Sequence, residues 1–190
     1  EISKKTWPRR TKLREFTGNV AHSNFDGLMF DRGPGPDGKF NVGGASHISL
    51  ADPSDPASES VVSVVDDYTG YKNRNGAIWG RGEYHLYKNL KLADNAIGFT
   101  HASGIPGIAP FTSRVVDSLF VGETDNIGNP TTPEEIAYGR SLPAAAADFP
   151  IRGYEYYDFH HEVENTTFVN FVPNDLRDAG AISYLLFTSF

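Results

Sequence analysis

The sequence predicts an all-β fold, a right-handed parallel β-helix in which short strands stack coil upon coil as a segment of a longer solenoid. Three observations predict it. The apolar runs are only a few residues long, asparagine and glycine mark the turns between them, and one turn pattern recurs along the chain. The 190 residues, of which 39% are hydrophobic and 13% aromatic, are sufficient for a single domain with a packed core over residues 1–190.

The predicted strands are six runs rich in β-branched and aromatic residues. In chain order they are residues 61–65, 84–86, 90–92, 115–121, 167–172 and 181–187. One short helix is predicted at residues 132–139, because a threonine N-cap is followed by proline, two glutamates and a closing glycine. Many short strands with so little helix indicate the all-β class.

The recurring turn consists of a polar residue, two others, glycine and usually an apolar residue that opens the next strand. Its glycines are Gly27, Gly76, Gly98, Gly128 and Gly180. A unit of roughly 22–30 residues is too small to bury its own apolar face, so neighbouring units must stack. The longer gaps predict loop insertions near residues 31–60 and 129–148, which are dense in proline, glycine and small polar residues. About seven coils are then expected.

The turn asparagines favour the same architecture. Asparagine at a bend tolerates the left-handed conformation and can stack on its counterpart one coil away. The apolar residues that follow the turns are expected to face the interior: Leu28, Phe30, Ile78, Phe99 and Ile182. The alternative is an antiparallel sandwich, which also has short strands and frequent turns. The repeat favours the β-helix over the sandwich.

The charge distribution excludes several classes of partner. The formal net charge is −7, from 17 basic and 24 acidic side chains. Basic residues cluster only between Lys4 and Arg14, so we expect no concentrated cationic face for nucleic acid. No apolar stretch approaches the roughly 20 residues of a membrane-spanning helix. Without cysteine, the chain has no disulfide framework, thiolate metal site or cysteine nucleophile.

Asp94, Glu123 and His101 are the candidate catalytic residues. Asp94 and Glu123 stand at comparable places before two turns, so stacking is expected to bring their carboxylates to one face, where such a pair can act as acid and base. His101 is a further candidate base. The alternative is that both carboxylates accept backbone N–H groups at coil corners. No histidine spacing indicates a metal site, and calcium is favoured over zinc as a cofactor.

Aromatic and guanidinium groups supply the predicted binding residues. Trp79 and Arg81 stand together beside a turn, and Arg152 precedes a group of tyrosines. The fork of arginine suits carboxylates, and an aromatic platform suits a sugar ring. The alternative is that the rings fill the interior or cap a coil. We expect one groove on one exposed face to contain Trp79, Arg81, Asp94, His101, Glu123 and Arg152.

Four sequence blocks carry a resemblance to a known family. They are residues 18–24 (GNVAHSN), 93–104 (ADNAIGFTHASG), 118–128 (SLFVGETDNIG) and 149–153 (FPIRG), the last followed by Thr167-Phe168. In this order and spacing they resemble the β-helical region of the family that includes the cell migration-inducing and hyaluronan-binding protein and the transmembrane cell surface hyaluronidase. The resemblance covers roughly residues 13–187.

The resemblance implies a right-handed parallel β-helix at the cell surface or outside the cell, in a protein several times longer than this chain. The remaining part of that protein, or another chain, is then an expected partner. No catalytic position is carried over, because the family's cleavage residues belong to an earlier part of the chain. The cysteines of the animal members are absent here. Asn165 opens a glycosylation sequon, which matters only on a secretory route.

Two functions fit these patterns. The first is binding or degradation of a hyaluronan-like polysaccharide by an extracellular β-helix. The second is a structural or adhesive segment of a larger extracellular assembly, without catalytic activity. The net charge favours the second, since a polyanion is repelled unless arginines gather locally, whereas the resemblance favours the first.

Overall fold

The computed structural model describes residues 5–32, 37, 39, 45–105, 110–127 and 148–185. Fifteen strands and one 3₁₀ turn, η1 (Asp125–Ile127), lie in this part of the chain, and no α-helix does. Every pairing between these strands is parallel. The all-β prediction is therefore confirmed, and the antiparallel sandwich is excluded.

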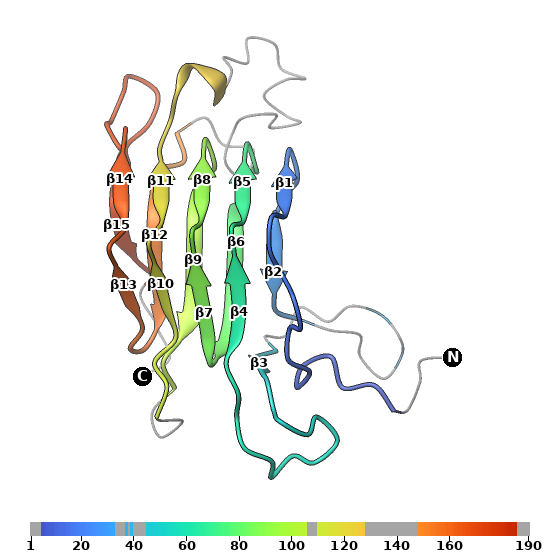
Figure 1. The fold of residues 1–190 in the computed structure, drawn as a ribbon. Helices are drawn as coiled ribbons and strands as arrows, with labels where there is room; N and C mark the ends of the chain where they lie inside the picture. The colour runs from blue at the N-terminus through green and yellow to red at the C-terminus, as the bar shows by residue number, and fades with distance from the viewer. Residues whose placement is uncertain are drawn as a thin grey trace.

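The strands form three sheets (Figure 1). The four-stranded sheet contains β4 (Ser63–Asp66), β7 (His85–Lys88), β10 (Arg114–Val116) and β13 (Glu162–Glu164). The five-stranded sheet contains β1 (Val20–His22), β5 (Thr69–Tyr71), β8 (Lys91–Ala93), β11 (Leu119–Val121) and β14 (Thr167–Val169). The six-stranded sheet contains β2 (Leu28–Phe30), β3 (His47–Ile48), β6 (Gly76–Glu83), β9 (Ile97–Ser103), β12 (Ile151–Asp158) and β15 (Ala179–Tyr184).

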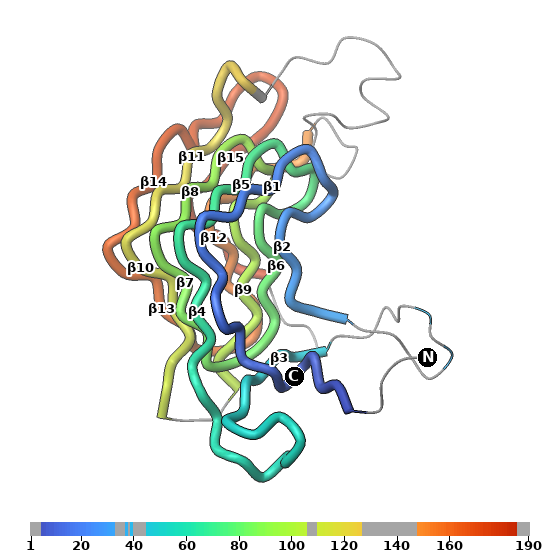
Figure 2. The backbone as a smooth tube through the Cα atoms, turned by 45° about the vertical axis from the view of Figure 1, so that its right-hand side comes forward, coloured from blue at the N-terminus to red at the C-terminus, as the bar shows by residue number. Residues whose placement is uncertain are grey.

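From β4 onward, consecutive strands go to different sheets. The chain runs through β4, β5 and β6, then β7, β8 and β9, and each strand pairs with the strand one circuit later. Figure 2 shows these circuits as stacked turns of the backbone around a common interior. Parallel strands in stacked sheets of this kind are consistent with a β-helix.

The described residues contain five circuits, so the expected number of about seven is wrong. The first circuit has β1 and β2, the other four have three strands each, and β3 lies in the insertion between the first circuit and the second. The reason is that the insertions lie inside circuits, between β2 and β4 and between β11 and β12. The counterpart of Gly98 is Gly153, because Arg152 pairs with Ile97 and Tyr154 with Phe99. The expected counterpart, Gly128, lies outside the described residues.

Residues in the left-handed conformation end the strands at two corners of the circuit. Before the five-stranded sheet they are Gly18, Asp67, Asn89, Asp117 and Asn165. Before the six-stranded sheet they are Ser23, Lys72, Asp94 and Asn170. Aspartate and asparagine tolerate this conformation better than most residues. The predicted strand at 115–121 is therefore two strands, β10 and β11, with the corner at Asp117 between them.

The asparagine ladder that the sequence predicts is confirmed at the second corner. The side-chain oxygen of Asn73 accepts the backbone N–H of Asn24 at 3.2 Å, and the oxygen of Asn95 accepts the backbone N–H of Asn73 at 3.0 Å. Asn95 in turn donates to the carbonyl oxygen of Gly70. These contacts satisfy backbone groups that leave the strand ladders at the bend.

Aromatic residues fill the interior of the stack. Ile78 and Phe99 are fully buried, as expected, and Leu28 and Phe30 are partly buried against the same core. The expectation is wrong for Ile182 of β15, which is 54% exposed because β15 is the last strand of its sheet among the described residues. The largest fully buried side chains also include Tyr68, Tyr87 and Tyr154. Each circuit thus contributes rings that contact those of the next, which is how units too small for their own core become stable.

Part of the insertion at 31–60 is described, and within it β3 pairs with β6 and extends the six-stranded sheet. Of the insertion at 129–148 only residue 148 is described, and the predicted helix at 132–139 lies outside the described residues. In the described part of the chain, no helix has the length and apolar character needed to cross a membrane.

Candidate functional site

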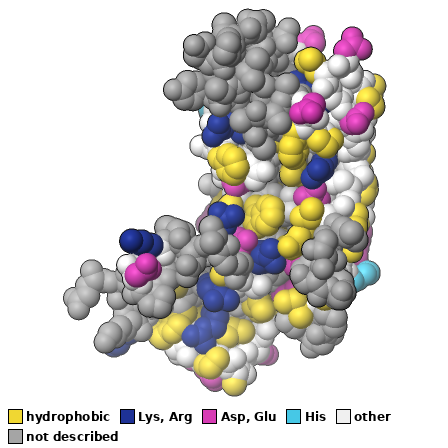
Figure 3. All heavy atoms as spheres, turned by 180° about the vertical axis from the view of Figure 1, so that it is seen from behind, with side chains coloured by type: hydrophobic (Ala, Val, Ile, Leu, Met, Phe, Trp, Pro, Cys, Tyr) yellow, Lys and Arg dark blue, Asp and Glu magenta, His cyan; other side chains and the backbone are white. Residues whose placement is uncertain are grey.

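The outer face of the six-stranded sheet carries a row of polar and aromatic side chains that stack in register. Trp79 of β6 pairs with Thr100 of β9, which pairs with Glu155 of β12, which pairs with Ser183 of β15. Figure 3 shows this side of the molecule, on which hydrophobic, basic and acidic side chains are intermixed. The row crosses four strands, and its two ends, Trp79 and Ser183, are partly exposed, whereas Thr100 and Glu155 between them are buried.

Arg81 is the centre of the first cluster on this face. Its Nε donates to Oδ2 of Asp31 at 3.2 Å, and its NH1 group donates to Oδ2 of Asp158 at 3.2 Å. Its guanidinium also lies over the ring of Tyr157, 5.1 Å from the ring centre. The indole Nε1 of Trp79 donates to Asp31 at 2.9 Å. One arginine therefore joins residues of β6, β12 and the segment after β2.

The two carboxyl groups on Arg81 differ in their affinity for a proton. Burial opposes the charged form of Asp31, but hydrogen bonds from Ala45, Arg32 and Trp79 and the charge of Arg81 outweigh it and lower its pKa. Burial raises the pKa of Asp158, because Arg81 only partly compensates and the charge of Asp31 adds to the effect. As the pH falls, Asp158 is expected to take up a proton before Asp31 does.

Arg152 and Glu155 form a second cluster along the same sheet. Glu155 accepts hydrogen bonds from the hydroxyls of Thr100 at 3.0 Å and Ser183 at 3.4 Å, and from Arg152. The Arg152 guanidinium lies over the ring of Phe149 at 5.0 Å. Both clusters therefore present arginines that are paired with carboxylates of the protein itself.

The arrangement can hold a sugar ring. Trp79 and Tyr157 lie with their ring centres 6.2 Å apart, and both are only partly buried. Aromatic faces pack against the C–H faces of sugars, while the neighbouring hydroxyl, carboxyl and guanidinium groups can exchange hydrogen bonds with hydroxyls.

The six residues expected in one groove do not share one exposed face. Trp79, Arg81 and Arg152 lie on the outer face of the six-stranded sheet. His101 points into the interior and is fully buried, because it alternates with the outward-facing Thr100 on β9. The expectation of a single six-residue groove is therefore wrong.

Asp94 and Glu123 lie at the corner between the five-stranded and six-stranded sheets. Asp94 is buried and accepts the backbone N–H of Thr124 at 2.7 Å and the hydroxyl of the same residue at 2.8 Å. Glu123 forms an ion pair with Arg177 at 3.3 Å and accepts a hydrogen bond from Asn174. The corner arrangement of Asp94 is the alternative that the sequence left open.

Sequence reasoning missed a column of polar rings inside the stack. His47 and His85 share a hydrogen bond of 2.7 Å, and the hydroxyl of Tyr154 lies 2.6 Å from a ring nitrogen of both His101 and His161. Burial lowers the pKa of His85 to about 3 and that of His161 to about 4. The histidines are therefore neutral near pH 7, and no periodic pattern in the sequence shows that their rings meet.

Asp31 was also missed, because it lies in the first insertion and meets Arg81 only when the circuits stack. Within the described ranges, no group of three or more histidine, aspartate or glutamate side chains is arranged to hold a metal ion. Asn165 is exposed at a corner, where its side-chain amide donates to Asp117.

Comparison with known proteins places this geometry in context. No family model matches the sequence. The chain is 33% identical over 196 residues to a Dictyostelium discoideum protein, a match that covers 96% of this chain and 18% of that protein. It is 30% identical over 201 residues to the human cell surface hyaluronidase CEMIP2, covering 96% of this chain and 14% of the relative.

A third relative agrees with these. The mouse cell migration-inducing and hyaluronan-binding protein is 31% identical over 194 residues, covering 92% of this chain and 14% of the relative. The chain is a relative of these hyaluronan-related proteins. The family resemblance noted in the sequence is therefore confirmed. The chain spans less than a fifth of the length of each of these relatives.

Proposed function

We propose that the chain is a segment of a right-handed parallel β-helix that binds a hyaluronan-like polysaccharide on the outer face of its six-stranded sheet. The handedness is supported by the general rule that about 98% of crossovers between parallel strands of one sheet are right-handed. The names of the relatives support hyaluronan or a similar glycan as the ligand.

One observation carries the choice of face. Trp79, Tyr157 and Arg81 come from two strands and lie in contact on the outer face, beside hydroxyl and carboxyl groups. An aromatic pair with convergent polar groups is the usual composition of a sugar-binding surface. In this proposal Trp79 and Tyr157 pack against the sugar ring, and Arg81 and Arg152 orient its polar groups.

The same proposal covers the domain organisation of the segment, its location and its partners. Residues 1–190 form a single β-helix segment with insertions near 31–60 and 129–148, and the protein acts at the cell surface or outside the cell. The remaining part of a longer polypeptide, or another chain, covers the end circuits. The names of the relatives and the small share of their length that the chain spans support this setting.

The experiment is a titration of the purified protein with hyaluronan oligosaccharides, followed by calorimetry. Trp79→Ala should weaken binding roughly tenfold, because the aromatic platform is lost. Leu119→Ala is the matched control, since Leu119 is an exposed apolar residue on the five-stranded sheet, and it should leave binding unchanged. Absence of binding by the unmodified protein would instead support the structural or adhesive role. Measuring the length of the glycan after incubation tests degradation in the same samples.

A further inference from the structure

A cavity of about 780 Å³ lies where the N-terminal segment packs against β3. The backbone holds this segment in place, since Ile48 donates to the carbonyl oxygen of Arg9 at 2.9 Å and Leu50 donates to that of Arg10 at 2.8 Å. Thr11 and Leu50 also form a parallel bridge. The volume is in the range of small-molecule sites, roughly 300–1,000 Å³.

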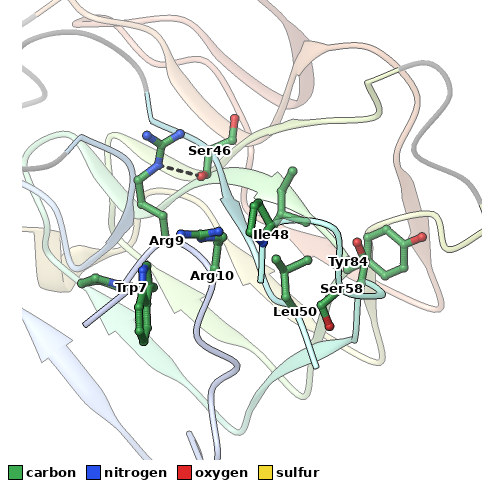
Figure 4. Close-up of a pocket in the computed structure, with 11 residues that line it drawn as sticks. Trp7, Arg9, Arg10, Ser46, Ile48, Leu50, Ser58 and Tyr84 are labelled. Atoms are coloured by element: carbon green, nitrogen blue, oxygen red, sulfur yellow. Dashed lines mark hydrogen bonds between the residues drawn. The ribbon is translucent and has the colours of Figure 1, made fainter. Parts of the chain in front are cut away.

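The lining combines an apolar base with cationic and aromatic groups. In Figure 4, Trp7, Arg9 and Arg10 lie on one side, Ser58 and Tyr84 lie on the other, and Ile48 and Leu50 lie between them. The Nε of Arg9 donates to the carbonyl oxygen of Ser46 at 3.2 Å, which fixes this guanidinium at the rim.

Within the ranges that the structure describes, no acidic side chain neutralises the two arginines of the cavity. Among the described residues, neither Arg9 nor Arg10 forms an ion pair, and no aspartate or glutamate lines the cavity. In a protein with a net charge of −7, two adjacent unpaired guanidinium groups are a local exception. They attract an anion, and their forks match a carboxylate.

We propose that this cavity is a second binding site, which takes a carboxylate-bearing sugar such as a uronate unit of an acidic polysaccharide. The carboxylate lies against Arg9 and Arg10, the ring packs on Trp7, and the serine hydroxyls exchange hydrogen bonds with the sugar hydroxyls. The site deepens the proposed function by naming the acidic sugar as the unit recognised, and it rests on that function only for the class of ligand.

The cavity is connected to the candidate face through the sheet. β2 pairs with residues 78–80 of β6, and β3 pairs with residues 82–83 of the same strand. Trp79 and Arg81 are therefore on the strand that also carries β3. Recognition of one polymer can then combine an uncharged contact on the sheet with a charged contact in the cavity.

The two tryptophans allow each site to be observed separately, because the chain contains no others. In Trp79→Phe the emission reports on Trp7 alone, and in Trp7→Phe it reports on Trp79 alone. Sodium glucuronate is titrated into each purified variant, with glucose as the uncharged sugar. Glucuronate should change the emission of Trp7 and not that of Trp79, and glucose should change neither at the same concentrations. A response to glucose equal to that to glucuronate would overturn the proposal.

Charge variants in the Trp79→Phe background complete the test. Arg9→Gln and Arg10→Gln should each weaken glucuronate binding roughly tenfold, as expected for a lost hydrogen bond to a charged group. Arg14→Gln removes the same charge from an exposed residue outside the cavity lining and should change binding less than twofold. Equal losses in all three variants would indicate a general charge effect and contradict the site. Failure of this test leaves the Trp79→Ala result on hyaluronan intact, so the two proposals can be judged independently.

Discussion

Two arginine sites of this protein use the same side chain differently. On the outer face of the six-stranded sheet, Arg81 lies between Asp31 and Asp158. In the N-terminal cavity, Arg9 and Arg10 have no ion-pair partner within the described part of the chain. Arg81 neutralises charge that the protein itself buries, whereas the cavity arginines can neutralise charge that a ligand brings.

The difference shows where an acidic polymer can be recognised by an acidic protein. An arginine already paired with carboxylates adds little net attraction for a polyanion, although its ring contacts and hydrogen bonds remain useful. Unpaired arginines beside an apolar base supply both attraction and orientation. The location of unpaired positive charge therefore matters more than the number of arginines.

The largest expected effect is the difference in protein stability between an arginine variant of the outer face and one of the cavity. Arg81→Ala should lower the free energy of unfolding by about 3 kcal/mol, because it leaves a buried carboxylate at Asp31 without its cationic partner. Arg9→Ala should change it by less than about 0.5 kcal/mol, since that side chain is exposed. Urea denaturation of both variants measures the difference. Equal losses would mean that Arg9 is also a structural ion-pair partner.

Acid should weaken the stack that supports both sites while the cavity arginines stay charged. The folded protein keeps His85 and His161 neutral, with pKa values of about 3 and about 4, whereas in the unfolded chain both take up protons below about pH 6.5. Stability is therefore full above that pH and falls as the pH is lowered toward 4.

Between pH 6 and pH 5 the two histidines together should cost about 2.5 kcal/mol of unfolding free energy. Urea denaturation at pH 7, 6 and 5 measures the total slope, to which His47 and His101, with pKa values also lowered by burial, add. His161→Gln should therefore reduce the loss between pH 6 and pH 5 by about 1.2 kcal/mol. A flat profile over this range would show that the rings are not held neutral in the interior.

Substitution of the two tryptophans should also lower the free energy of unfolding more at the outer face than at the cavity, but by less than substitution of the arginines does. Trp79→Phe removes the indole donor to Asp31 and should cost about 1 kcal/mol of unfolding free energy. Trp7→Phe should cost less than about 0.5 kcal/mol, because the backbone of Arg9 and the side chain of His47 hold this segment against β3 without the indole. Thermal unfolding of the two variants, compared with the unmodified protein, checks the order.

The smallest expected effect is that of salt on the affinities of the cavity and of the outer face for their ligands. Raising the salt concentration from 0.05 to 0.5 M should weaken glucuronate binding at the cavity roughly threefold, because the unpaired guanidinium charges are screened. Binding of a neutral oligosaccharide to the outer face should change little, since the arginines of that face are paired with carboxylates of the protein. Parallel titrations at the two salt concentrations provide the comparison, and an equal salt response would remove the distinction.

The sequence by itself determined the class of fold and the chemistry of the bends. The short β-rich runs, the asparagine and aspartate corners and the recurring glycines depend on local backbone preferences, which each residue carries with it. That is why the parallel strands and the Asn73–Asn95 contact could be predicted. Trp79, Arg81 and Arg152 are selected in the sequence by the chemistry of their side chains, whereas their place on one sheet comes from the structure.

Only the tertiary structure decided which residues meet. Arg81 contacts Asp31, 50 residues earlier, and Asp158, 77 residues later, because insertions of different lengths separate strands that stack directly on each other. The length of an insertion leaves no periodic trace in the sequence, so the sequence overestimates the number of circuits. The sequence also does not show that His101 faces the interior, and the expected groove wrongly includes it. The stacking register places that histidine in the interior, and it leaves Arg9 and Arg10 beside an open cavity without an ion-pair partner among the residues described.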